Sequence, residues 1–189
     1  MDSRFECDRQ SKYDFVASVT NYFDDKYGDS DVSCRFYEYS TDKTSLVEFD
    51  SEDSDSTSRT DLCMEFTSGV VSTFYNIELK ERWGRYADDY YGEEGKEGWF
   101  LNIEKESVLR HCDKIPIYVN LYPNGKIRIW NLNKVKREDY GKETKPIHKY
   151  TVKDSEILMQ DRYTLMNKQG FTIPRIKGEK SDGKWASHR

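Results

Sequence analysis

Three charged side chains on two neighbouring segments of this chain have the types and spacing for metal-assisted chemistry. Asp61 begins one segment, and Glu78 and Lys80 lie two residues apart on the next. Carboxylate oxygens are ligands that Mg²⁺ prefers, and a bound Mg²⁺ lowers the pKa of its water and stabilises charge on a phosphate. A lysine beside such a site can orient the attacking water or neutralise the transition state. The three residues therefore predict a metal site for phosphate chemistry.

Residues 61–82 are predicted to form the β-hairpin that brings these side chains together. Apolar and polar residues alternate on both sides of a turn-forming Ser-Gly pair. We expect Thr67 to pair with Val70, a register that places Asp61 opposite Asn76. Directly opposed residues point to the same side of a sheet, and a slip of one residue would mix the two faces. The acidic and basic side chains are therefore expected to meet on one face, near the end of the hairpin.

This arrangement resembles the core of the PD-(D/E)XK nuclease superfamily, in which an Asp on one strand and a Glu-x-Lys on the next form the metal site. Asp61 matches the first position, and the run Glu78-Leu79-Lys80 matches the second. The resemblance implies that Asp61, Glu78 and the carbonyl of Leu79 bind Mg²⁺ or Mn²⁺, and that Lys80 orients the water. The helix after these strands often carries a basic residue in this family, and Lys105 is the matching position.

The same residues have a plainer interpretation. Charged side chains usually face water, so Glu78 and Lys80 would form a solvated pair on an exposed strand face, and Lys105 would be an ordinary helix lysine. The chain also departs from the family pattern, because no proline precedes Asp61 and the first predicted helix shows no acidic residue on its core face.

The pattern of elements predicts an α+β (α/β) fold with a mixed central β-sheet flanked by helices, and the resemblance implies a restriction endonuclease-like α-β-β-β-α-β core. The first helix is expected after about ten polar residues, with Ser11 as its cap and Gly28 as its stop. Helices are predicted over residues 12–27 and 101–112, and strands over 32–39, 45–49, the central hairpin, and a second hairpin at 115–132.

Residues 1–132 are predicted to form the nuclease-like core domain, and residues 133–189 a basic C-terminal extension that is partly irregular. The chain has 189 residues and a formal net charge of −5, but residues 126–189 hold 16 basic and 8 acidic side chains. This asymmetry suggests an acidic, metal-attracting part joined to a basic strip that tracks phosphates, and a merely solubilising tail is an equal alternative. Residues 50–60 and 83–98 are expected to be loops.

The resemblance implies a magnesium-dependent nuclease that hydrolyses phosphodiester bonds of DNA, with RNA as the other candidate substrate. Its acidic site would need the metal before a polyanion could approach, since bare carboxylates repel phosphate. The alternatives are a catalytically inactive nuclease-fold module that binds nucleic acid or protein, and an α+β interaction protein in which the motif match is accidental.

Features that are missing from the sequence limit the partners and the cellular location that we expect. There is no apolar run of about 18 residues and no apolar leader, and the four cysteines are scattered without a metal-binding spacing. We therefore expect a soluble, cytoplasmic protein with reduced thiols and no membrane partner. A homodimer is compatible with the cutting of both strands of a duplex.

Overall fold

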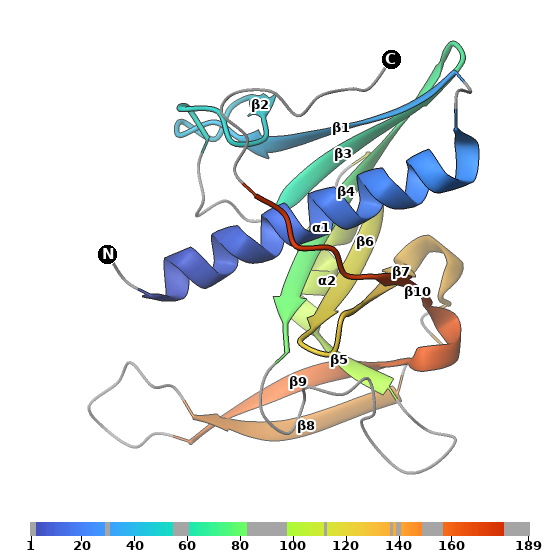
Figure 1. Ribbon diagram of the computed structural model, residues 1–189. Coiled ribbons are helices and arrows are strands. Elements are labelled where there is room, and N and C mark those ends of the chain that lie inside the picture. The colour runs from blue at the N-terminus through green and yellow to red at the C-terminus, as the bar shows by residue number, and fades with distance from the viewer. Residues whose placement is uncertain are drawn as a thin grey trace.

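The computed structural model describes residues 3–28, 31–54, 61–82, 98–111, 113–136, 138, 141–148 and 157–179. These residues form a mixed α+β structure (Figure 1). The first part of the chain contains α1 (Ser3–Tyr27), β1 (Val32–Tyr39), β2 (Leu46–Glu48), β3 (Leu62–Ser68) and β4 (Val71–Glu81). The second part contains β5 (Gly98–Asn102), α2 (Ile103–Arg110), β6 (Ile115–Tyr122), β7 (Lys126–Asn131), β8 (Gly141–His148), β9 (Ile157–Met166) and β10 (Phe171–Pro174). None of the described helices is long and apolar enough to cross a membrane.

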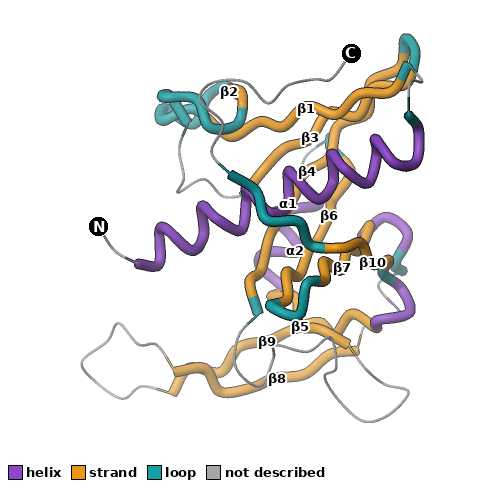
Figure 2. The backbone as a smooth tube through the Cα atoms, viewed as in Figure 1, coloured by secondary structure: helices purple, strands orange, loops and turns teal. Residues whose placement is uncertain are grey.

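A seven-stranded mixed sheet forms the centre of the protein, with strand order β10-β7-β6-β4-β3-β1-β2. The pair β4 and β6 is parallel, and every other neighbouring pair is antiparallel. The chain leaves the end of β4 and passes through α2 before it enters β6, as a parallel pair requires. A separate three-stranded sheet, β5-β9-β8, lies beyond the end of the main sheet at which β4 finishes (Figure 2). The predicted mixed sheet with helices is confirmed at this level.

Two apolar clusters bury the two faces of the main sheet. On one face, Phe15, Val16 and Val19 of α1 pack with Leu62 and Ile77 of the central strands. The cluster on the other face joins β5, α2, β6, β7 and β9, and it contains Leu101, Leu109, Tyr118, Tyr122, Trp130, Leu132, Val135 and Leu165. The hydrophobic alternation of the strands therefore contributes to two cores, and buried polar residues such as Glu78 and Asn120 lie on the second face, on the central strands β4 and β6.

The central hairpin has the predicted faces but a different register. Ser68 pairs with Val71 and Leu62 with Ile77, which is two residues from the register expected from the sequence. The turn therefore closes tightly around Gly69, whose positive φ of 58° suits a glycine. A shift of two residues keeps every side chain on its predicted face, because strand side chains alternate with a period of two. Asp61, one residue before Leu62, consequently lies opposite Glu78 rather than Asn76.

The first helix ends as predicted but begins nine residues earlier. Gly28, with φ of 53°, follows α1, and its N–H donates to the Asp24 carbonyl oxygen at 2.9 Å. Ser11 is not a cap, because it lies inside the helix and donates to Glu81 Oε2 at 2.6 Å. Arg9, in the part of the helix that precedes the predicted start, contacts the sheet through an ion pair with Glu38. No hydrophobic periodicity marks such a segment.

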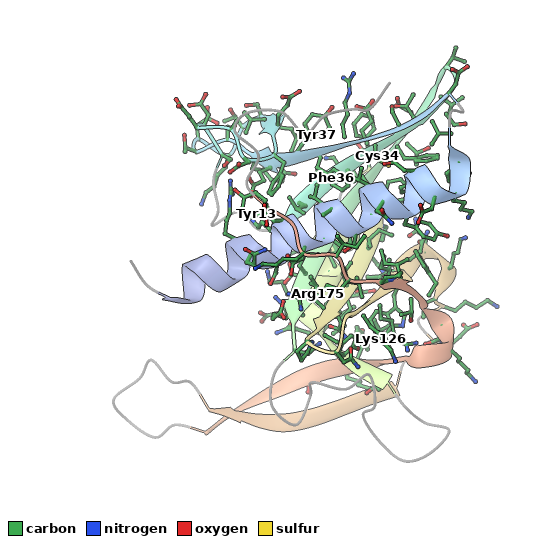
Figure 3. All side chains as sticks on the ribbon, in the orientation of Figure 1. Tyr13, Cys34, Phe36, Tyr37, Lys126 and Arg175 are labelled. Carbon is green, nitrogen blue, oxygen red and sulfur yellow. The ribbon has the colours of Figure 1, made fainter. Side chains whose placement is uncertain are left out.

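The C-terminal part of the chain returns to the central sheet. β10 pairs with β7 at the sheet edge, and the residues after it cross α1 (Figure 3). Arg175 forms ion pairs with Asp14 of α1 at 2.7 Å and with Glu81 of β4 at 2.6 Å. Asp14 is only 4% exposed because the C-terminal segment covers it, and its Oδ1 also accepts from the Gly178 N–H at 2.9 Å. Gly178 packs so closely on α1 that a Cβ atom there would lie 2.2 Å from the Tyr13 carbonyl oxygen.

The two predicted loops fall largely outside the described residues. Residues 55–60 and 83–97 are not described, so the loop predictions there remain predictions. Asp50, at the start of the acidic stretch, accepts hydrogen bonds from Tyr13 at 2.7 Å and from Arg9 at 2.5 Å. This residue is therefore part of a side-chain network rather than a solvated loop position.

Candidate functional site

Asp61 is fixed by two backbone contacts at the start of β3. Its N–H donates to the Ile77 carbonyl oxygen at 3.1 Å, and its Oδ2 accepts from the Leu79 N–H at 2.6 Å. The side chain is thereby held across the middle residue of the Glu78-Leu79-Lys80 run. One carboxylate oxygen is occupied by a backbone donor, which leaves Oδ1 to serve a ligand.

Glu78 is the most deeply placed acidic residue of the site. Its side chain is fully buried, and two ammonium groups contact its two carboxylate oxygens. Lys80 Nζ lies 2.6 Å from Oε1, and Lys105 Nζ lies 3.2 Å from Oε2. Oε1 has this ion-pair contact but accepts no well-oriented hydrogen bond from the residues described. A buried oxygen with an incomplete set of hydrogen bonds is chemically suited to a cation.

Lys105 reaches Glu78 because α2 packs on the same face of the sheet. The helix begins at Ile103, two residues later than predicted, and Asn102 caps it by accepting from the Glu104 N–H at 2.7 Å. Leu109, which is 1% exposed, anchors the helix in the second core. The structure thus brings together all four side chains singled out in the sequence, Asp61, Glu78, Lys80 and Lys105. The interpretation of Glu78 as a solvated residue was wrong.

The electrostatics of the site follow from burial and from this pairing. Burial raises the pKa of Asp61, and the neighbouring Glu78 raises it further, whereas Lys80, the Leu79 N–H and Lys12 oppose the rise. Burial alone would lower the pKa of Lys80, but the charges of Glu78 and Asp61 outweigh it and raise that pKa. Lys80 is therefore a stable cation at neutral pH, which suits charge neutralisation better than proton transfer.

Arg82 and two side chains of β6 belong to the same surface and were not singled out in the sequence. Arg82 Nε donates to Asn120 Oδ1 at 2.9 Å, and its Nη2 donates to the Tyr118 hydroxyl at 2.8 Å. In the parallel register, Tyr118 lies opposite Glu78 and Asn120 lies opposite Lys80. Arg82 continues the alternation of Glu78 and Lys80, so the strand period already placed it on this face. Its partners on β6 depend on a parallel pairing that no local pattern reveals.

Lys12 of α1 is the second group that sequence reasoning missed. The side chain is 5% exposed, its Nζ lies 2.7 Å from Glu38 Oε1, and its charge acts on Asp61. No signal distinguished it, because a lysine inside an apolar stripe normally extends its ammonium group to solvent.

The residues present fit a single divalent cation bound with help from its substrate. Asp61 and Glu78 supply carboxylate oxygens from directly opposed positions, and Mg²⁺ commonly uses one or two carboxylates together with water and phosphate. No cluster of three or more acidic, histidine or cysteine side chains suited to a metal occurs within the described ranges. Water and phosphate oxygens would therefore have to complete the coordination.

Comparisons with family models, with curated proteins and with solved structures found no match to this chain.

Proposed function

We propose that this protein is a metal-dependent nuclease of the PD-(D/E)XK type that hydrolyses DNA phosphodiester bonds. The observation that carries the proposal is the convergence of Asp61, Glu78, Lys80 and Lys105, in which two lysines contact the carboxylate that lies opposite Asp61. Apart from the inserted strands β2 and β5, the series α1, β1, β3, β4, α2 and β6 also supports it, because it follows the α-β-β-β-α-β order of that core, with β4 parallel to β6.

In this proposal the residues divide the work of hydrolysis. Asp61 and Glu78, with the Leu79 carbonyl, would hold Mg²⁺ or Mn²⁺, which would supply an acidified water and stabilise charge on the phosphate. The hydrogen bond from the Leu79 N–H orients the Asp61 carboxylate. Lys80 orients the attacking water and neutralises the charge that develops on the phosphate, while Lys105 steadies the phosphate from the α2 side. Burial of Glu78 excludes water from the inner side of the site.

One observation favours a second candidate, a catalytically inactive module that binds nucleic acid. Both oxygens of Glu78 contact lysines, so the charge of this carboxylate is neutralised without any metal cation. A protein that uses these lysines only to hold phosphates would bind DNA in a salt-dependent manner and leave it intact.

Cleavage of circular and single-stranded DNA in Mg²⁺, Mn²⁺ or EDTA distinguishes the two candidates. Glu78→Gln and Lys80→Ala should each abolish metal-dependent nicking. Lys26→Gln is the matched control, because Lys26 is an exposed lysine of α1, which covers the other face of the sheet. Nicking that survives both site substitutions would reject this site as the source of activity. Salt-sensitive binding without nicking in any metal would replace the nuclease with the binding module.

A further inference from the structure

The acidic and basic groups of the site differ sharply in how far they reach solvent. The Glu78 side chain is 0% exposed, whereas those of Lys80 and Lys105 are 42% and 40% exposed. The ammonium group of Lys80, on β4, contacts one oxygen of this carboxylate, and that of Lys105, on α2, contacts the other. A ligand that approaches from solvent therefore meets cationic groups first, with the carboxylate behind them.

The charges of the described side chains at this entrance also sum in favour of an anion. Asp61 and Glu78 contribute two negative charges, while Lys80, Lys105 and the nearby Arg82 contribute three positive charges. The expectation from the sequence, that bare carboxylates would repel phosphate until a metal arrived, took no account of where the lysines lie. Their exposed ammonium groups screen the buried carboxylates from an incoming anion.

We infer that Lys80 and Lys105 form a phosphate-binding site that works without a metal, and that phosphate and a divalent cation promote each other's binding at Glu78. A phosphate group accepts hydrogen bonds from the ammonium groups and draws them away from the carboxylate. The oxygens of Glu78 then become available to a cation, because the cation no longer has to compete with the lysines for them. Binding free energies are reciprocally linked, so each ligand must raise the affinity of the other by the same factor.

This inference deepens the proposed function and rests on it only where the phosphate is a DNA phosphodiester. The lysines hold the substrate phosphate even before a metal is bound, and the bound phosphate then raises the affinity for the metal. The same chemistry would bind free inorganic phosphate, so both ligands belong in the test.

Calorimetric titration of the full-length protein in EDTA tests the metal-free step. We expect inorganic phosphate and a short single-stranded oligonucleotide both to bind, with at least tenfold weaker binding in Lys105→Gln and Lys80→Gln. Lys26→Gln should match the wild-type protein. Lys105→Gln retains the contact between Lys80 and Glu78, so it keeps the test valid if Lys80→Gln fails to fold. Binding of the oligonucleotide alone would assign the site to nucleic acid rather than to free phosphate.

A Mg²⁺ titration at rising phosphate concentration tests the linkage. We expect the affinity for Mg²⁺ to rise about fivefold at saturating phosphate, within the usual range of coupling between sites. Phosphate binding only in the presence of Mg²⁺, or metal-free binding that is unchanged in Lys105→Gln, would overturn the inference. DNA cleavage is scored separately. Metal-free phosphate binding without cleavage would reject the nuclease and keep the phosphate site. Cleavage without any effect of phosphate on the affinity for Mg²⁺ would keep the nuclease and reject the linkage.

Discussion

The carboxylate of Asp61 accepts a hydrogen bond from the backbone N–H of Leu79 at 2.6 Å, although the two residues lie 18 positions apart. Leu79 is the middle residue of the Glu78-Leu79-Lys80 run, so this bond couples the two halves of the candidate site. Any movement of β3 against β4 would separate Asp61 from Glu78 and break the bond. The site can therefore form only when the hairpin has this register.

Substitution of Asp61 separates its structural role from its proposed chemical role. Asparagine keeps an oxygen that can accept from the Leu79 N–H, whereas alanine leaves this donor without its partner. We expect Asp61→Asn to change the free energy of unfolding by less than about 1 kcal/mol and Asp61→Ala to lower it by about 1–3 kcal/mol. Both variants should lose metal-dependent cleavage. Urea denaturation and the nicking assay measure the two effects, and equal stability of the variants would contradict the structural role.

The two lysines of the site should show strongly non-additive effects on stability. Lys80→Ala or Lys105→Ala leaves Glu78 with one ammonium partner, and because each lysine is about 40% exposed we expect a loss of only about 1 kcal/mol. The double variant leaves a fully buried carboxylate unpaired and should lose about 3–5 kcal/mol. Denaturation of the three variants forms a double-mutant cycle. Simple additivity would mean that Glu78 finds another partner.

Arg175 should be essential to stability although it lies far along the chain from the site. Its side chain is 15% exposed and neutralises Asp14 and Glu81, which are 6% and 9% exposed. We expect Arg175→Ala to lower the free energy of unfolding by about 3–5 kcal/mol. Lysine should restore only part of this, because a single ammonium group lacks the fork that spans both carboxylates. Lys168→Ala, at an exposed position, is the control. An equal loss of stability in that variant would mean that the ion pairs of Arg175 with Asp14 and Glu81 do not stabilise the fold.

The thiol of Cys34 should be unreactive at neutral pH. Burial, aided by the charge of Asp24, raises the pKa of Cys34 from 9.0 to about 12. The folded state therefore favours the protonated thiol, and the stability this contributes is fully present below pH 9 and lost as the pH rises towards 12. Alkylation by iodoacetamide followed by mass spectrometry should show Cys34 modified much more slowly in the native protein at pH 8 than in urea, because less of the thiol is ionised. Rapid modification of the native protein would contradict this burial.

Much of the fold, and most of the side chains of the site, could be predicted from local sequence patterns. Alternation indicated the strand faces and the second hairpin, and Gly28 indicated the end of α1. Because strand side chains have a period of two, the faces stayed correct even though the hairpin register was off by two residues. The start of α1 was not visible in the sequence, because no hydrophobic periodicity precedes residue 12 and Arg9 contacts the sheet through an ion pair with Glu38.

The sequence by itself determined which residues share a face: Asp61, Glu78 and Lys80 follow from strand periodicity alone. Only the tertiary structure decided that Glu78 is buried, that Lys105 of α2 reaches it, and that Arg175 clamps α1 to β4. The parallel pairing of β4 with β6, which places Tyr118 and Asn120 beside the site, was likewise decided there. The physical reason is the range of the forces. Alternation is set between neighbours along the chain, whereas burial and ion pairing depend on which distant segments the two cores bring together.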